Sequence, residues 1–192
     1  MVKFGFIVEG ETEKILLESE DFRGFLSNKL NITFVPEVIN VVGNNNLLPY
    51  KRKEFTEILI NKGANQIVIL TDQDADKCIT ETKNRIAPDE AQVCIIAKKQ
   101  IESWFLADTL ALKNFIGANI MLYDLPESVD NPFLEIRKIK IEKTGRGFVD
   151  NKRFLAKSML NSGFSFERAA AHANCTSAKY FIDKLKQLSQ IN

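Results

Sequence analysis

Four short apolar runs recur along the first half of the chain and alternate with amphipathic segments. The runs cover residues 2–8, 32–42, 66–71 and 91–97, and the second is extended around Pro36. Their length and their bounding turn residues predict four strands. Between and after them, apolar residues at helical spacing predict helices at 15–30, 48–63 and 77–86 and from residue 101 onward. This alternation predicts a parallel or mostly parallel four-stranded sheet with helices on both faces.

The last part of the chain has a different pattern, with short helical segments and no further strand. Helices are expected at 109–117, 132–143, 151–161, 165–173 and 176–189, and Pro126 and Pro132 bracket an irregular link. This part holds too few apolar positions for an independent core. We therefore expect residues 118–192 to form a helical extension that packs on an α/β domain of residues 1–117.

Composition narrows the class of protein. A chain of 192 residues, 45% hydrophobic and 27% charged, is typical of one globular domain, and a net charge of +1 does not exclude a nucleic-acid partner. Three cysteines without close pairing and a single histidine exclude a Cys/His zinc finger and argue against a disulfide scaffold. The first strand begins at once, and no apolar run approaches the roughly 20 residues that span a bilayer, so a cytoplasmic protein without membrane contact is expected.

Two of the predicted strands end abruptly in carboxylates. Glu9 follows the first strand and precedes Gly10, while Asp72 and Asp74 follow the third strand. Because the carboxyl ends of parallel strands meet at one edge, these acids are expected to form a cluster. Glu13 lies one helical turn after Glu9, on the same face. Such acids repel one another, and an all-oxygen ligand set that offsets the repulsion favours Mg²⁺ or Mn²⁺ over zinc or copper.

Several of these acids also have a purely structural interpretation. Glu11 and Glu13 would favour a helix N-terminus electrostatically, and Asp76 would serve only as a helix cap. These roles do not account for an acid such as Glu9 at the end of a buried strand.

Further polar residues follow the fourth strand. Glu102 would complete the metal site, and Lys98 or Lys99 would neutralise a phosphate or stabilise a developing oxyanion. The sequence does not separate the two lysines, and a lysine pair is also typical of an exposed surface. A weaker basic group comprises Arg146, Lys152 and Arg153. It would contact a nucleic-acid backbone, or it is simply an exposed helix start.

These motifs resemble the TOPRIM domain, the fold shared by topoisomerases, bacterial-type primases and the OLD-type (overcoming lysogenisation defect) nucleases. The match consists of a glutamate with glycine at a strand end, Val8-Glu9-Gly10, and a D-x-D after a later strand, Asp72-Gln73-Asp74. The E-G-x-T-E motif of residues 9–13 most resembles that of the OLD-like branch. Residues 101–108, and 177–181 near the end, are similar to small stand-alone TOPRIM-like proteins of uncharacterised function, often found near prokaryotic defence or mobile-element genes.

The resemblance implies a TOPRIM-like, Rossmann-like fold and Mg²⁺-dependent hydrolysis of phosphodiester bonds in nucleic acid, with Mn²⁺ as a substitute ion. The implied metal ligands are Glu9, Glu13, Asp72, Asp74 and Glu102, and the implied catalytic residues are Glu9, Lys98 and Lys99. Two metals would divide water activation and leaving-oxygen stabilisation between them. OLD-type nucleases join TOPRIM to an ATPase domain, and this chain contains none, so a separate ATPase or another protein is an expected partner.

A function of a different class stays open at this point. The chain would then be a non-catalytic TOPRIM-like subunit that binds a nucleic acid, a nucleotide or a partner protein. The intact acidic set favours catalysis, whereas a small chain without an obvious substrate groove favours binding. A phosphate-binding loop of Walker type is excluded by its spacing, and a single histidine makes a Ser/His/Asp or Cys/His site improbable.

Overall fold

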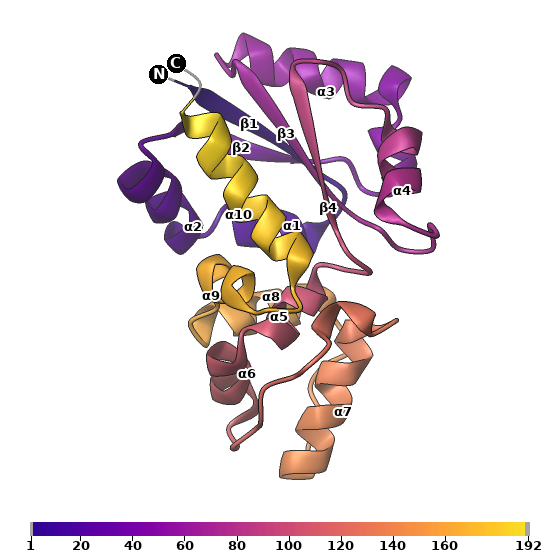
Figure 1. Ribbon diagram of the computed structural model, residues 1–192, viewed down its shortest axis with the longest axis vertical. Helices are drawn as coiled ribbons and strands as arrows, with labels where there is room; N and C mark the ends of the chain where they lie inside the picture. The colour runs from indigo at the N-terminus through magenta and orange to yellow at the C-terminus, as the bar shows by residue number, and fades with distance from the viewer. Residues whose placement is uncertain (1, 191–192) are drawn as a thin grey trace.

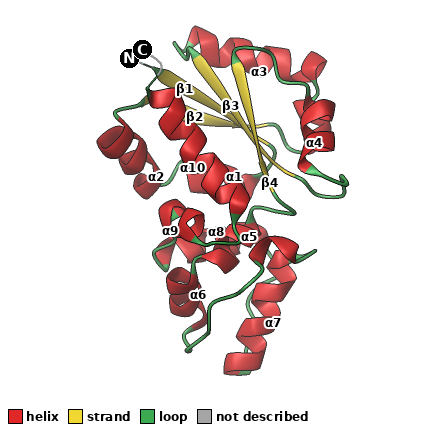
Figure 2. Ribbon diagram, in the orientation of Figure 1, coloured by secondary structure: helices red, strands yellow, loops and turns green. Residues whose placement is uncertain are grey.

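The computed structural model describes residues 2–190, and a four-stranded sheet forms its centre (Figure 1, Figure 2). The strands are β1 (Lys3–Val8), β2 (Thr33–Asn40), β3 (Gln66–Asp72) and β4 (Gln92–Ala97). Their order is β2-β1-β3-β4, and every pairing is parallel. The structure confirms the predicted α/β fold and its parallel sheet.

Successive side chains of each strand point to opposite faces of the sheet, so apolar residues project from both faces. Helices cover each face and bury these residues. On one face Ile7 and Ile69 pack with residues of α3 (Pro49–Asn61) and α4 (Ile79–Ile86). On the other face Phe6 and Leu70 belong to a larger core shared with α1 (Glu11–Leu17), α2 (Glu20–Gly24) and α10 (Thr176–Ser189). The expectation of helices on both faces is therefore confirmed.

The segment predicted as a helix over residues 15–30 forms three shorter helical segments, the first of which begins at Glu11. Helix α1 ends at Leu17, and the Ser19 hydroxyl then accepts a hydrogen bond from the Phe22 amide at 3.3 Å, which starts α2. A π-helical turn, η1 (Phe25–Lys29), completes the segment. Another short helical turn, the 3₁₀ turn η2 (Asn44–Leu47), begins directly after Gly43.

The remaining helices lie together beyond the carboxyl edge of the sheet (Figure 1). They are α5 (Glu102–Ala107), α6 (Thr109–Ile116), the 3₁₀ turn η3 (Pro126–Ser128), α7 (Pro132–Thr144), α8 (Lys152–Asn161) and α9 (Phe166–Ala171). Helix α10 then runs back over the sheet. The division expected at residue 117 stays a prediction. No helix within residues 2–190 has both the length and the hydropathy that crossing a membrane requires.

Aromatic contacts join this helical group to the sheet domain, and an ion pair holds two of its own helices together. Phe181 of α10 stacks on Trp104 of α5 at 5.4 Å and on Phe22 of α2 at 5.8 Å between ring centroids. Asp108, whose side chain is fully buried, accepts two hydrogen bonds of 2.8 Å from the Arg168 guanidinium. The core is thus continuous from the sheet into the helical group.

Candidate functional site

A cavity of about 290 Å³ opens where the carboxyl ends of β1 and β3 meet the first turns of α1, α5 and α8. The side chains and backbone that line it come from Glu9, Gly10, Glu11, Thr12, Glu13, Asp72, Asp74, Ile101, Glu102, Lys152 and Arg153. All the acids expected as metal ligands therefore line one cavity, although they come from distant parts of the chain. The parallel topology brings them together, since each follows a strand end or begins the next helix.

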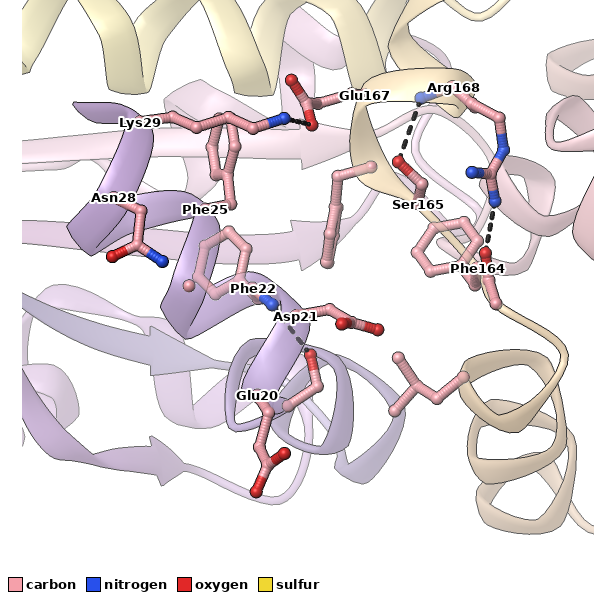
Figure 3. A pocket seen from close by; sticks show the side chains of 15 residues that line it. Glu20, Asp21, Phe22, Phe25, Asn28, Lys29, Phe164, Ser165, Glu167 and Arg168 are labelled. Carbon is pink, nitrogen blue, oxygen red and sulfur yellow. Dashed lines mark hydrogen bonds and ion pairs between the residues drawn. The ribbon is translucent and has the colours of Figure 1, made fainter.

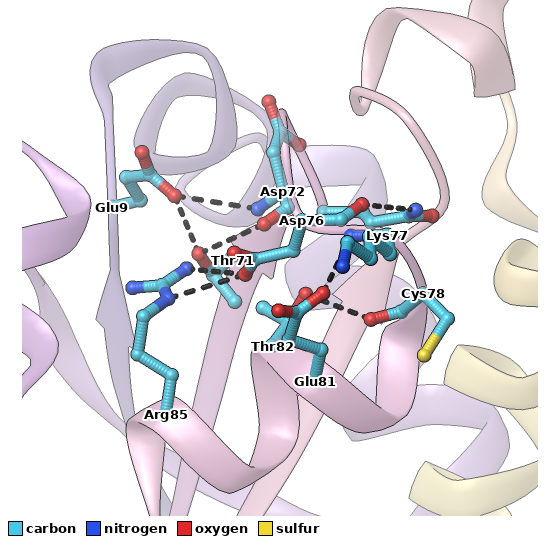
Figure 4. Close-up of polar contacts among 10 residues, drawn as sticks. Glu9, Thr71, Asp72, Asp76, Lys77, Cys78, Glu81, Thr82 and Arg85 are labelled. Atoms are coloured by element: carbon cyan, nitrogen blue, oxygen red, sulfur yellow. Dashed lines mark hydrogen bonds and ion pairs between the residues drawn. The ribbon is translucent and has the colours of Figure 1, made fainter.

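Glu9 is held at the end of the neighbouring strand. Its backbone N–H donates to the carbonyl oxygen of Leu70, which extends the pairing of β1 with β3. Its carboxylate Oε2 accepts a hydrogen bond from the Thr71 hydroxyl and a 3.4 Å hydrogen bond from the Asp72 amide (Figure 4). Burial raises the pKa of Glu9 above the usual value, and the nearby Asp74 charge adds to the rise. The sequence motifs did not identify Thr71 as a partner of Glu9, although its hydroxyl-bearing side chain directly precedes the D-x-D motif.

Asp72, the last residue of β3, and Glu102, the first residue of α5, are both buried. Asp72 is 7% exposed, and its Oδ1 accepts a 2.8 Å hydrogen bond from the Ile101 amide. Glu102 is 0% exposed, and its Oε1 accepts a hydrogen bond from the Thr12 hydroxyl at 3.4 Å. Both carboxylates thus face the cavity from a region that water scarcely reaches.

Glu13 is the third buried carboxylate, and it packs against the turn that follows Glu9. Its side chain is 4% exposed, and a Cβ added at Gly10 would lie 3.0 Å from its Oε2. Gly10 therefore leaves the space that the Glu13 carboxylate occupies. Its own backbone amide and the Lys152 charge lower the pKa of Glu13, but burial outweighs both.

The acids raise one another's pKa values. Burial first, and then the charges of Glu102 and Glu9, raise the pKa of Glu13 to about 8. Burial, followed by the charges of Glu13 and Glu102, raises the pKa of Asp72 well above its ordinary value. Like charges confined in a poorly solvated site disfavour full ionisation, so this cavity favours a bound proton or a cation.

Lys152 supplies the cation that faces these buried acids. It begins α8, where Asn151 caps the helix by accepting a hydrogen bond from the Phe154 amide, and its Nζ lies 3.2 Å from Glu102 Oε2. Burial lowers the pKa of Lys152, but the charges of Glu102 and Asp72 outweigh it, so the pKa is raised. A residue expected at a nucleic-acid backbone therefore lies against the acid cluster.

The other expected basic residues occupy different positions. Arg153 lies at the rim of the cavity and pairs with Glu11 at 3.3 Å, whereas Arg146 is exposed in the link after α7 and does not line the cavity. Neither Lys98 nor Lys99 lines it either. The Lys98 amide donates to the Ser177 hydroxyl at 3.2 Å, and the Lys99 ammonium lies 2.6 Å from an Asp130 carboxylate oxygen.

Asp74 and Asp76 have separate surroundings after β3. Asp74 is exposed, has a positive φ of 50°, and lies between the acidic cavity and a neighbouring polar cavity of about 580 Å³ that Lys99 also lines. Asp76 pairs with Arg85 of α4 at 2.9 Å (Figure 4) and does not line the acidic cavity. Helix α4 begins after Cys78, so Asp76 is not its N-cap.

The acidic set fits a hard cation by its chemistry but does not form a coordination sphere as it stands. Within residues 2–190, no group of three or more His, Cys, Asp or Glu side chains is arranged to hold a metal ion. Instead Glu9 turns to Thr71, and Asp72 turns to the Ile101 amide. Nevertheless, carboxylate oxygens are the donors that Mg²⁺ prefers, and three buried carboxyl groups, those of Glu13, Asp72 and Glu102, face the Lys152 ammonium.

A separate cavity of about 530 Å³ lies between α2 and the link from α8 to α9 (Figure 3). Phe22, Phe25 and Phe164 border it, and Lys29 and Glu167 pair across its rim. None of the motif acids reaches this cavity, so it is not part of the acidic site.

Comparison of the chain with protein-family models, with curated proteins and with solved structures finds no match.

Proposed function

We propose that this chain is a TOPRIM-type nuclease that hydrolyses phosphodiester bonds of nucleic acid with Mg²⁺, for which Mn²⁺ can substitute. The observation that carries the proposal is the confinement of three buried carboxylates, from Glu13, Asp72 and Glu102, opposite one ammonium group. Burying ionised carboxylates without full compensation destabilises a fold. Such a cluster is expected where a bound cation restores the balance of charge.

The proposed ligands are five acids that line the cavity, namely Glu9, Glu13, Asp72, Asp74 and Glu102. When bound, the metal would polarise the phosphate and lower the pKa of water. Glu9 is half-buried with a raised pKa, so its Oε atoms suit proton transfer at the reacting group. The Lys152 ammonium would stabilise negative charge that develops on the phosphate.

The substrate is proposed to approach from the open side of the cavity, where Arg153 is exposed. Arg146, Lys98 and Lys99 lie outside the acidic cavity, so we propose contacts with neighbouring phosphates for them rather than with the reacting one. A separate ATPase or other protein partner and a cytoplasmic location complete the proposal.

The test is a cleavage assay with plasmid and single-stranded substrates in Mg²⁺, Mn²⁺ or EDTA. The isosteric variants Glu9→Gln and Asp72→Asn are expected to lose activity by at least about 100-fold, as removal of a proton-transfer or charge-stabilising group does. The matched controls Glu57→Gln and Asp183→Asn change exposed acids of α3 and α10 and should keep wild-type activity. Cleavage that persists in both site variants would identify a contaminating nuclease.

A non-catalytic TOPRIM-like subunit is the second candidate function. It is favoured by the protein donors that already engage the acids, namely Thr71, the Ile101 amide and Lys152. Such a subunit would bind an oligonucleotide, a nucleotide or a partner in EDTA, and Asp72→Asn would bind equally well. Absence of metal-dependent cleavage at a large excess of wild-type enzyme, together with binding in fluorescence anisotropy, would favour this function.

A further inference from the structure

We propose that Lys152 and the divalent ion exchange at the same buried carboxylates, so that Lys152 compensates Glu102 without the ion and leaves it when the ion binds. The proposal rests on the metal site of the proposed function and adds a regulatory residue to it. It also gives the helical group a part in ion binding, because Lys152 belongs to α8.

Contacts at Glu102 indicate which partner can move. One carboxylate oxygen, Oε1, accepts from the Thr12 hydroxyl, and the other, Oε2, faces the Lys152 ammonium at 3.2 Å. Thr12 has a short side chain within α1 and is 5% exposed. Lys152 has a long flexible side chain that is 44% exposed at the start of its helix. An ion that binds Glu102 therefore displaces the lysine rather than the threonine.

Charge gives the direction of the exchange. Within residues 2–190, the cationic side chains that line the cavity are those of Lys152 and Arg153, and Arg153 pairs at the rim with Glu11. Only Lys152 therefore stands against the buried acids. An ammonium and a divalent ion at one carboxylate repel strongly in a poorly solvated site, and the divalent ion carries the larger charge. Ion binding would release the Lys152 ammonium toward the mouth, where a substrate phosphate would meet it.

The first test measures Mn²⁺ affinity by isothermal titration calorimetry at pH 8 without nucleic acid. Lys152→Met is expected to bind Mn²⁺ at least about tenfold more tightly than the wild type, because the competing cation is gone. Lys152→Arg keeps the charge and should stay near the wild-type affinity. Arg153→Met removes the same charge at the rim and should change the affinity by less than about threefold. Equal or weaker binding by Lys152→Met, with an unchanged thermal unfolding profile, would overturn the exchange.

A second test follows Lys152 in the wild-type protein. Acetylation by an N-hydroxysuccinimide ester, read by mass spectrometry, is compared between Lys152 and the exposed Lys157 on the same helix. Added Mn²⁺ should raise the labelling of Lys152 relative to Lys157. An unchanged ratio under saturating Mn²⁺ would overturn the exchange while leaving the metal site intact. Absence of Mn²⁺ binding in the wild type and in Lys152→Met would overturn the metal site itself.

Discussion

Replacement of Glu13 by glutamine is expected to destabilise the ion-free protein slightly at pH 5 and to stabilise it at pH 8. The Glu13 side chain is 4% exposed, and burial with the charges of Glu102 and Glu9 raises its pKa from 4.5 to about 8. In the unfolded chain this carboxyl loses its proton near pH 4.5, whereas in the folded protein it keeps the proton until about pH 8. Between these values the folded state binds more protons, so the free energy of unfolding falls as the pH rises.

The size of this effect follows from the two pKa values. Each pH unit between them lowers the free energy of unfolding by about 1.4 kcal/mol. Relative to a pH at which Glu13 is protonated in both states, the wild type is therefore about 4 kcal/mol less stable at pH 8 and less than about 1 kcal/mol less stable at pH 5. Glutamine does not ionise, and its buried amide costs about 1–2 kcal/mol at every pH. The difference in unfolding free energy between Glu13→Gln and the wild type should therefore grow by about 3 kcal/mol from pH 5 to pH 8.

Urea unfolding followed by circular dichroism measures this difference at pH 5, 6.5 and 8 in metal-free buffer. The control Glu57→Gln changes a glutamate whose side chain is 61% exposed and should give a difference that is independent of pH. A pH-independent difference for Glu13→Gln would refute the reasoning, because it would mean that the Glu13 carboxylate is ionised in the fold. Saturating Mg²⁺ should reduce the pH dependence by stabilising the ionised form.

Three further substitutions test the fold and the site. Asp108→Ala removes a helix cap and both hydrogen bonds to Arg168, so urea unfolding should show a loss of about 2–4 kcal/mol; a loss below about 0.5 kcal/mol would contradict the role of this pair. Phe181→Ala removes a fully buried aromatic side chain that stacks on Trp104 and leaves a cavity, so the free energy of unfolding should fall by about 3–5 kcal/mol in the same assay. Gly10→Ala places a Cβ 3.0 Å from Glu13 Oε2. It should change stability by less than about 1 kcal/mol but weaken Mn²⁺ binding at least about threefold in calorimetry, and unchanged affinity would show that the Glu13 carboxylate has room to move.

Most of the fold could be predicted from the periodicity of apolar residues. The strand expected at 66–71 is found at Gln66–Asp72, and the helix expected at 176–189 is found at Thr176–Ser189. A helix that buries one face has apolar residues at helical spacing, and a buried parallel strand is a continuous apolar run. Both patterns can be recognised within the residues of the element itself. The break at Ser19 and the π-helical turn at Phe25–Lys29 were not visible, because the apolar spacing continues through them.

The acidic part of the site was also predictable, for a topological reason. In a parallel sheet every strand delivers its carboxyl end to the same edge, so Glu9 and Asp72 were expected at that edge. The strand order, in which β1 lies next to β3, then makes them neighbours. The structure places them in one cavity, with the Asp72 amide donating to Glu9. No comparable rule applied to Lys98 and Lys99, whose directions depend on a turn in which Lys99 has a positive φ of 61°.

The sequence by itself thus determines the strands and the acids that follow them, because a buried strand is a short apolar run and its carboxyl end is the next residue along the chain. The position of Lys152 has a different origin. Helix α8 packs on α1, and the link before it is anchored by Phe148, which packs against Phe133 and Phe154. Those contacts join residues far apart in the chain and carry no periodic signature. Only the packed tertiary structure therefore brings an ammonium group from the helical region to Glu102, a carboxylate that has no other cationic partner within residues 2–190.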